Sequence, residues 1–420
     1  MFENILGHEH LIGQLNTSIG SRTLPSTLLF AGPAYSGKLT TALEVARGLT
    51  CTGDGSWGCR CHACEQQRAL LHPETMLVGN RDFLPEIRLA RRSLLRGPQP
   101  ATLYLFLRSV RKLTRRFDSL LWEGDEQRVA KCTEILNDVE ELLRSLDPDR
   151  SLSAEGDLEK VSTEIVGRIE EARRHIPSEL TPIAVVRNLS FWARIAPAGP
   201  AKVAIIDDAE GLNEASRNAM LKILEEPPAS VHFILIAERG QAVIETVRSR
   251  ARTYTFGPRG TATERSVIER IFRDSDVDSH SLREYFLSHA GEQERETVSH
   301  MARRAAELIR ATPGWERHAA LEALAKDIDT NLGRNGYRGF FEELLRNLAG
   351  SVAGGSSERP AGGGAENEAP VGGEVEAVLD RRRVGEAVAE AAHRTEVLNM
   401  SLHNVLEDLM YKMEHHAEVH

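Results

Sequence analysis

The chain has 420 residues, of which 41% are hydrophobic and 27% are charged, and its formal net charge is −10. This composition is ordinary for a globular protein of about two to four domains. The acidic balance argues against a protein that coats nucleic acid by bulk charge, although it leaves room for a local basic site. No apolar run approaches the roughly 18 residues that span a bilayer. Residues 1–4 do not begin a basic and then apolar leader, which predicts a cytoplasmic protein.

Residues 1–50 predict a helix, a short strand and a second helix. The apolar run Leu28–Phe30 ends in a turn at Gly32, and residues 41–46 carry helical spacing. Between the strand and the second helix, residues 32–38 have the spacing of the phosphate loop G-x-x-x-x-G-K-[ST] up to Lys38. Glycines let backbone N–H groups face a phosphate, and the lysine and the helix N-terminus add positive charge.

This phosphate loop departs from the pattern at two positions. The hydroxyl residue expected after Lys38, as a Mg²⁺ ligand, is Leu39, and Thr40 lies about 100° further around the helix. Tyr35 fills a position where such loops have a small residue. We therefore expect a loop that keeps its shape and does not support productive ATP hydrolysis. The candidate nucleotide-binding residues in it are Gly32, Gly37, Lys38 and Thr40.

Four of the five cysteines lie within residues 51–64. Cys51, Cys59, Cys61 and Cys64 form a C-x7-C-x-C-x2-C pattern. Four thiolates close in sequence suit a closed tetrahedral Zn²⁺ site with a structural role. The alternatives are free thiols, or three cysteine ligands with His62 in place of the fourth.

Residues 84–178 predict a helix-rich segment with opposed charges. Residues 81–120 carry 10 basic and 3 acidic side chains, whereas residues 121–180 carry 8 basic and 16 acidic ones. Such blocks often lie side by side as antiparallel helices. Arg108, Arg111, Lys112, Arg115 and Arg116 share one face of a possible helix. They either contact DNA phosphates or, as we favour, pair with the acidic half.

Two continuous apolar runs, residues 202–207 and 231–237, predict strands that are buried on both faces of a parallel sheet. With the helical patterns between them, they indicate a doubly wound α/β core. The first run ends in Asp207 and Asp208, where a P-loop protein places its Mg²⁺-binding carboxylate and its water-polarising residue. We therefore add Asp207 and Asp208 to the candidate nucleotide site.

The C-terminal part is expected to be helical, with one interruption. Residues 262–348 look all-helical, and residues 350–373 contain eight glycines and predict a flexible loop. The last helix has an apolar stripe, for which packing against the preceding helices is favoured over binding of a partner. The stripe consists of Leu398, Leu402, Val405, Leu406, Leu409 and Met413.

The segment from Asn218 to Pro228 reads N-A-M-L-K-I-L-E-E-P-P. It resembles the N-A-L-L-K-x-L-E-E-P-P signature of bacterial DNA polymerase III clamp-loader subunits, the gamma/tau and delta prime group of the AAA+ superfamily. Arg248–Ala251 is similar to the S-R-C motif of that family, with Ala251 in place of the cysteine. The zinc module after the first long helix also agrees. The resemblance covers residues 1–80 and 181–257, and residues 84–178 are an insertion that it does not cover.

The resemblance implies an AAA+ domain over residues 1–257, a small helical lid over 258–312 and a helical collar over 313–420. It implies gamma/tau and delta partners in a hetero-pentameric ring, a sliding clamp and primed DNA. The altered phosphate loop and the run Asp208–Glu210 favour the delta prime branch, a stator without ATPase activity of its own. Its Arg250 would be an arginine finger for a neighbouring ATPase subunit, with Arg248 as the second candidate and an ordinary surface arginine as the alternative.

Two other functions compete with the stator. One is a gamma/tau-type subunit that hydrolyses ATP, against which Leu39 and Tyr35 argue. The other is a zinc-containing DNA-binding regulator on a P-loop scaffold, against which the acidic net charge argues. Assembly with other loader subunits would separate these classes, since a regulator would not form such a complex.

Overall fold

The computed structural model describes residues 1–146, 155–177, 180–275, 281–288, 292–310, 315–331, 333–350, 384–392, 394–395 and 401–415. The chain divides into two compact units, Met1–Ala290 and Gly291–His420. Among the helices in these described stretches, none combines the length and the apolar character that crossing a bilayer requires. The predicted loop at 350–373 lies, from residue 351 on, outside the described residues.

The first unit is built on a five-stranded parallel sheet with the strand order β2-β3-β4-β1-β5. Its strands are β1 (Thr27–Ala31), β2 (Thr75–Gly79), β3 (Lys202–Asp207), β4 (Val231–Ala237) and β5 (Arg252–Thr255). The strands β1, β3 and β4 confirm the three apolar runs. Their side chains are almost entirely buried, because parallel sheets are covered on both faces.

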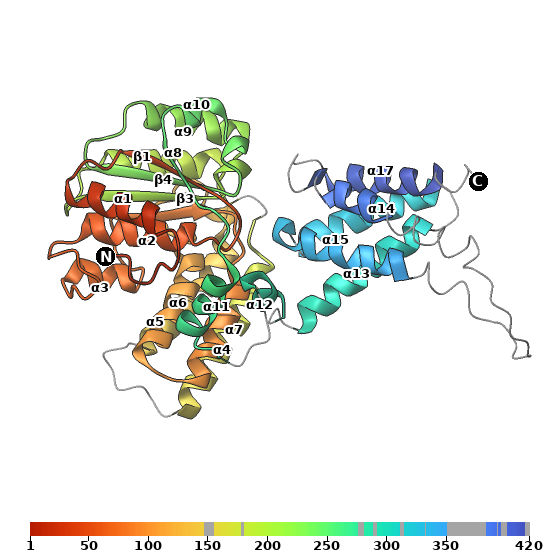
Figure 1. Ribbon diagram of the computed structural model, residues 1–420, viewed down its shortest axis with the longest axis horizontal. Helices are drawn as coiled ribbons and strands as arrows, with labels where there is room; N and C mark the ends of the chain where they lie inside the picture. The colour runs from red at the N-terminus through yellow and green to blue at the C-terminus, as the bar shows by residue number, and fades with distance from the viewer. Residues whose placement is uncertain are drawn as a thin grey trace, which may run out of the picture. The chain divides into compact units, whose positions relative to one another are not determined.

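Helices cover both faces of this sheet (Figure 1). On one side lie α1 (Glu9–Gly20) and α2 (Lys38–Thr50), and on the other lie α8 (Ile183–Arg194), α9 (Glu214–Glu225) and α10 (Glu245–Arg248). The short helix α3 (His62–Arg68) follows the cysteine-rich loop. This confirms the predicted α/β class, a parallel sheet with helices on both faces.

In its described residues, the insertion forms a bundle of four α-helices, visible below the sheet in Figure 1. They are α4 (Leu84–Arg96), α5 (Pro100–Thr114), α6 (Ala130–Ser145) and α7 (Glu155–Arg173). The short turn η1 (Arg115–Phe117) continues α5 toward the sheet. The basic and acidic halves pack side by side, as the charge pattern predicted, and Arg88 of α4 pairs with Glu170 of α7 over 2.8 Å. The unit ends with α11 (Thr261–Ile271) and α12 (Leu282–Ser288).

The second unit is helical in all of its described stretches. It contains α13 (Glu292–Arg310), α14 (Trp315–Asn331), α15 (Gly333–Gly350) and α17 (Leu402–His415). Leu402, Val405, Leu406 and Leu409 of α17 are buried in one core with Phe340 of α15 and Leu321 of α14. Packing therefore accounts for the apolar stripe of the last helix. Leu398 of that stripe lies outside the described residues.

Candidate functional site

The loop between β1 and α2 has the backbone conformation that its glycines allow. Gly32 has φ +151°, and a Cβ on it would lie 2.1 Å from the carbonyl oxygen of Phe256, the residue after β5. Gly37 has φ +91° and precedes the first residue of α2, Lys38. Both conformations are accessible to glycine and strained for other residues. The loop therefore lies against the end of β5 at Gly32, with no room for a side chain there, and Gly37 lies against the guanidinium of Arg259.

Lys38 is bound to the loop that contains it. Its Nζ donates to the carbonyl oxygens of Gly32 and Pro33 over 2.5 and 2.6 Å, and the side chain is buried. Burial, followed by the charge of nearby Arg81, lowers the pKa of Lys38 to about 8. The ammonium group that the sequence assigned to a phosphate thus has protein partners.

The hydroxyl groups of α2 do not supply what the loop pattern requires after the lysine. Leu39 is buried in the hydrophobic core. Thr40 is half-buried, and it is Thr41 whose hydroxyl donates to a loop carbonyl, that of Gly37, over 2.9 Å. The structure therefore puts a core side chain where a Mg²⁺ ligand would be needed.

Other side chains hold the loop from outside the motif. Arg259 donates from Nη1 to the carbonyl of Tyr35 over 2.6 Å and from Nε to that of Leu6 over 3.0 Å. His8 Nε2 lies 3.0 Å from the carbonyl oxygen of Ser36. The Tyr35 ring packs on a ring of α12, that of Phe286, with 4.9 Å between centroids. Sequence reasoning missed Arg259, because nothing in its local pattern links it to a loop more than 200 residues earlier.

The carboxylate of Asp207, at the end of β3, is buried and paired with two arginines. Its Oδ2 lies 3.1 Å from Nε of Arg81 and 3.3 Å from Nη2 of Arg116. Arg81 follows β2, the neighbouring strand, and Arg116 comes from η1 of the insertion. The residues around Asp207 therefore do not fit a divalent cation, because two guanidinium groups already neutralise this oxygen and Leu39 supplies no hydroxyl.

Arg116 is held firmly in this position. Only 1% of its side chain is exposed, its Nη1 donates to the carbonyl of Arg81 over 2.7 Å, and its guanidinium lies 4.4 Å from the ring centroid of Phe83. Burial and the neighbouring Arg81 lower its pKa to about 10 against the pull of Asp207, so that it stays charged at neutral pH.

Asp208 and Glu210 take part in the turn that follows β3. Asp208 has φ +67°, and its carboxylate lies against Gly211, where a Cβ would be 2.3 Å from Oδ2. Glu210 accepts from the backbone N–H groups of Glu238 and Arg239, over 3.1 and 3.4 Å, at the end of β4. Burial raises the pKa of Glu210. The Glu210 carboxylate therefore ties the turn after β3 to the end of β4.

The predicted finger, Arg250, lies on the surface just after α10. Its Nη2 donates to Oε1 of Glu225 over 2.9 Å, and its Nη1 donates to the carbonyl of Thr246 over 2.8 Å. Its side chain is 35% exposed. The second candidate, Arg248, is less accessible, and its buried Nε has no hydrogen-bond partner within the described residues. Arg250 is thus the more available of the two guanidinium groups.

The four clustered cysteines come together as a possible metal centre. The Sγ atoms of Cys51, Cys59, Cys61 and Cys64 all lie within 4.8 Å of one another. Those of Cys51 and Cys59 are 3.7 Å apart and those of Cys51 and Cys61 are 3.8 Å apart. Tetrahedral zinc with bonds of about 2.3 Å would place sulfurs about 3.8 Å apart. A Cβ on Gly53 would lie 2.7 Å from Sγ of Cys59, so that glycine makes room for the cluster.

A buried cation supports the cysteine cluster. Arg47 of α2 donates from Nη1 to Sγ of Cys64 over 3.4 Å and to the carbonyl of Ser56 over 3.0 Å. Burial raises the pKa of Cys64 to about 12. At Cys61, hydrogen bonds from Thr52 and from the backbone outweigh burial and lower the pKa to about 5. The donor set therefore fits a closed site for a soft, four-coordinate metal ion.

The basic face of α5 points into the protein. Its five cations pair with carboxylates, and only one of these, Glu140, belongs to a helix of the acidic half. The pairs are Arg108–Glu44, Arg111–Glu140, Lys112–Glu86, Arg115–Asp118 and Arg116–Asp207. Arg111, Lys112 and Arg116 are buried. Pairing with the acidic half is therefore confirmed for Arg111 and wrong for the other four cations, whose carboxylates lie elsewhere in the chain. Surface contact with DNA phosphates at this face is not supported, because these cations already have partners.

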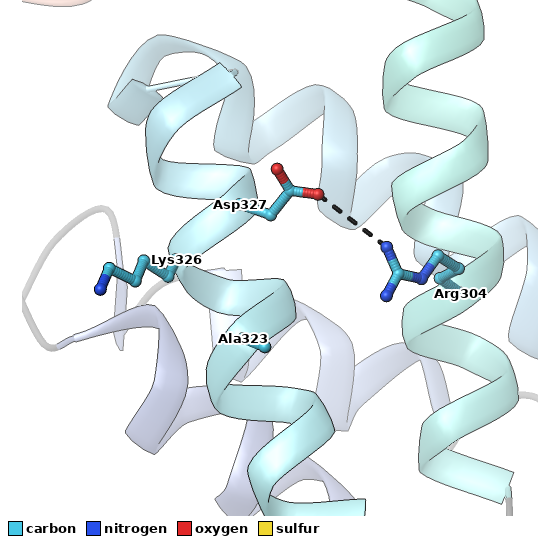
Figure 2. A pocket seen from close by; sticks show the side chains of 4 residues that line it. All are labelled: Arg304, Ala323, Lys326 and Asp327. Carbon is cyan, nitrogen blue, oxygen red and sulfur yellow. Dashed lines mark ion pairs between the residues drawn. The ribbon is translucent and has the colours of Figure 1, made fainter.

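A shallow hollow lies in the second unit, which contains none of the predicted site residues. Figure 2 shows Arg304 of α13 facing Asp327 of α14, with Ala323 and Lys326 beside them. The ion pair joins Nη1 of Arg304 to Oδ2 of Asp327 over 3.9 Å, and both side chains are nearly half exposed. Exposed pairs of this kind contribute little energy. We assign no chemistry to this hollow.

Comparison with known proteins decides the family. Residues 7–144 and 163–259 match the family described as "DNA polymerase III, delta subunit", and together they make up more than half of the chain. The chain belongs to this family. The predicted resemblance to bacterial clamp-loader subunits is thereby confirmed, and most of the insertion lies inside the matched range.

Individual relatives of this clamp-loader chain match it over shorter stretches. It is 40% identical to the DNA polymerase III subunit delta′ of Escherichia coli over 74 residues, which are 18% of this chain and 21% of that protein. It is 34% identical to subunit gamma/tau of Mycobacterium tuberculosis H37Rv over 92 residues, 22% and 16% of the two chains. It is 35% identical to the replication factor C small subunit of Methanocella arvoryzae over 98 residues, 23% and 30% of the two chains.

These matches cover less than a third of the length of each relative. Among solved structures, a gamma subunit-related protein from Thermotoga maritima is similar with 14% identity and a TM-score of 0.23. That match covers 60% of this chain and 88% of the other. The relatives include delta prime and gamma/tau subunits alike, so the family is shown without distinguishing these two members.

Proposed function

We propose that this chain is the delta prime subunit of a DNA polymerase III clamp loader, a stator that has no ATPase activity of its own. The observation that carries the proposal is that the two key charged groups of its own nucleotide-type site already have partners within the protein. Lys38 binds loop carbonyls and Asp207 is paired with Arg81 and Arg116. A subunit that turns over ATP needs both groups for the phosphates and the metal.

In the assembled loader, Arg250 would face ATP held by a neighbouring gamma/tau subunit. A guanidinium there neutralises charge that develops on the transferring phosphoryl group, and the planar fork of arginine suits phosphate oxygens. The exposure of Arg250 at the end of α10 supports this role. Glu225 and the carbonyl of Thr246 would orient the Arg250 guanidinium, and these residues would take no chemical part in ATP hydrolysis.

The partners that follow from this proposal are gamma/tau and delta subunits in a hetero-pentamer, together with a sliding clamp and primed DNA. We further propose Zn²⁺ as the structural ion of the four cysteines and the cytoplasm as the location. In the same proposal, residues 258 to 312 form a helical lid domain, and the residues from 313 onward form a helical collar. The collar would join this subunit to its neighbours.

The experiment that tests the stator uses the assembled ring. We expect Arg250→Ala to leave the fold and the assembly intact and to lower DNA-stimulated ATP hydrolysis. Arginine fingers contribute on the order of 10³–10⁵ in rate at the site they face in GTPase systems. Arg252→Ala, an exposed arginine two positions along, is the matched control. An unchanged rate of ATP hydrolysis in the ring that carries Arg250→Ala would refute the assignment of Arg250 as the arginine finger.

The second candidate is a gamma/tau-type motor, favoured by the similarity to gamma/tau over 92 residues. ATP binding and hydrolysis by the purified chain, with Lys38→Ala as the control, separate the two. We expect a stator to show no ATP hydrolysis that depends on Lys38. Lys38-dependent hydrolysis by the chain alone would instead mean that Thr40 or water replaces the missing hydroxyl, and the motor would become the better description.

A further inference from the structure

The insertion reaches the acidic end of β3 through one side chain. Arg116, in the turn η1 that follows α5, lies 3.3 Å from Asp207, which is 91 positions away in the sequence. Arg81 contacts the same carboxylate oxygen over 3.1 Å. Asp207 and Arg116 are each 1% exposed. The carboxylate that a P-loop protein offers to a metal is therefore enclosed by guanidinium groups.

A divalent cation could take the place of the guanidinium groups at Oδ2 of Asp207 only after both arginines had moved. Arg116 would lose its bond to the carbonyl of Arg81 and its place over the Phe83 ring. If it stayed, its charge would repel the ion at short range in a medium of low dielectric constant. A buried guanidinium left without its anion is also costly. The arrangement therefore resists exchange for a metal.

The insertion makes a second contact with the helices that adjoin the phosphate loop. Leu89 of α4 is buried in a small cluster with Ile268 of α11 and with Phe272, Leu282 and Tyr285. Arg96 at the end of α4 forms a two-bond ion pair with buried Asp274, with 2.9 Å for each bond.

These contacts continue from α12 to the phosphate loop. Asp274 also accepts from the hydroxyl of Tyr285 over 3.1 Å. The next residue of α12, Phe286, packs on Tyr35 of the loop. The tyrosine that departs from the phosphate-loop pattern is thus one end of a series of contacts whose other end is the insertion.

We propose that the helical insertion locks the nucleotide-type site of this chain into a form that takes no divalent cation. Arg116, with Arg81, occupies the cation position at Asp207, and α4 fastens α12 onto the phosphate loop. The inference rests on the proposed absence of nucleotide turnover and supplies its physical cause. It also assigns a role to the insertion, which is to stabilise one conformation from within.

The test is binding of Mn²⁺, used as a spectroscopic substitute for Mg²⁺, to the full-length chain. We expect wild type and Asp207→Asn to bind Mn²⁺ equally weakly by electron paramagnetic resonance. We expect the double variant Arg81→Gln/Arg116→Gln to bind it roughly tenfold more tightly or better. Adding Asp207→Asn to the double variant should abolish that gain. Arg144→Gln, an exposed arginine of α6, is the control for surface charge.

Two outcomes would overturn the lock. One is a Mn²⁺ site in the wild-type chain that Asp207→Asn removes, and this comparison holds even if the double variant fails to fold. The other is a folded double variant that binds Mn²⁺ no better than wild type. Neither outcome changes the expected ATPase rate of a ring that carries Arg250→Ala. The proposal that the insertion excludes a cation and the proposal that the chain is a stator can therefore fail separately.

The second contact is tested by amide hydrogen exchange in residues 282–288. We expect exchange there to be unchanged by ATP with Mg²⁺ in the wild type and to become faster in Arg96→Ala. Arg92→Ala, an exposed arginine one turn earlier on α4, should have a smaller effect. Protection of α12 by the nucleotide in the wild type would contradict the lock, as would equal exchange in Arg96→Ala and wild type.

Discussion

Arg250 and Glu225 form an ion pair of 2.9 Å that joins two motifs of the chain, the end of α9 and the residues after α10. In the sequence, Glu225 is part of the signature segment from Asn218 to Pro228. In the structure it is also the partner of the proposed finger. The pair is exposed at 35% and 51%, so it contributes little to stability and acts chiefly on where the guanidinium lies.

Glu225→Gln is expected to lower the ATPase of the assembled ring by a smaller factor than Arg250→Ala. The amide retains an oxygen that can accept a hydrogen bond, but it loses the charge that orients Arg250. The free energy of unfolding should change by less than about 1 kcal/mol. Glu226→Gln, at the exposed neighbouring position, is the control. Equal ATPase rates for the two glutamine variants would show that Glu225 does not position the finger.

The stability of the chain should rise with pH across the titration of Lys38. The pKa of this lysine is about 8 in the folded chain and ordinarily 10.5, so between these values the unfolded chain binds more protons. Stability therefore increases from pH 8 to 10.5, by on the order of 3 kcal/mol, as the buried ammonium loses its charge.

Lys38→Met isolates this contribution, because the cysteines and tyrosines that also titrate in this window are the same in both proteins. The measurement is urea unfolding of wild type and variant at several pH values. The wild type should gain stability relative to Lys38→Met as the pH rises. Parallel curves would contradict a buried, charged lysine.

Substitution of a clustered cysteine is expected to release the proposed zinc ion, whereas substitution of the remaining cysteine is not. Cys61→Ser should release one equivalent of zinc and lower the free energy of unfolding by about 4 kcal/mol or more, because a closed thiolate site contributes directly to folding. Cys132→Ser is the matched control, since Cys132 is buried in the insertion, where its Sγ lies 3.1 Å from the carbonyl oxygen of Val129. Metal analysis and unfolding of both variants provide the check. Zinc retained in Cys61→Ser would exclude that residue as a ligand.

Gly32→Ala is expected to destabilise the first unit by about 2 kcal/mol or more. The new Cβ would meet the carbonyl oxygen of Phe256 at 2.1 Å, and the φ of +151° is strained for alanine. Gly13→Ala is the opposite case, since this exposed helical glycine has nothing within 4 Å of a Cβ. It should stabilise by up to about 1 kcal/mol. Equal unfolding midpoints for the two alanine variants would contradict the close approach at Gly32.

The sequence alone determined the class of the fold and the position of the main motifs. Apolar runs and a glycine turn predicted β1, β3 and β4, since strands buried on both faces must be apolar throughout. It did not predict β2, a short run of five residues, or β5, an edge strand in which only Tyr254 is buried. Cysteine spacing likewise predicted that four thiols come together, because these residues are neighbours in the chain.

Only the tertiary structure decided which charges meet. The basic stripe of α5 was visible in the sequence, but its partners come from several elements, and Asp207 lies 91 residues beyond Arg116. In the same way, Arg259 reaches the phosphate loop across 224 positions to Tyr35. Periodicity reports the local environment of a side chain and carries no information on a distant partner. That is the physical reason why the phosphate loop could be read from the sequence and its arginine neighbours could not.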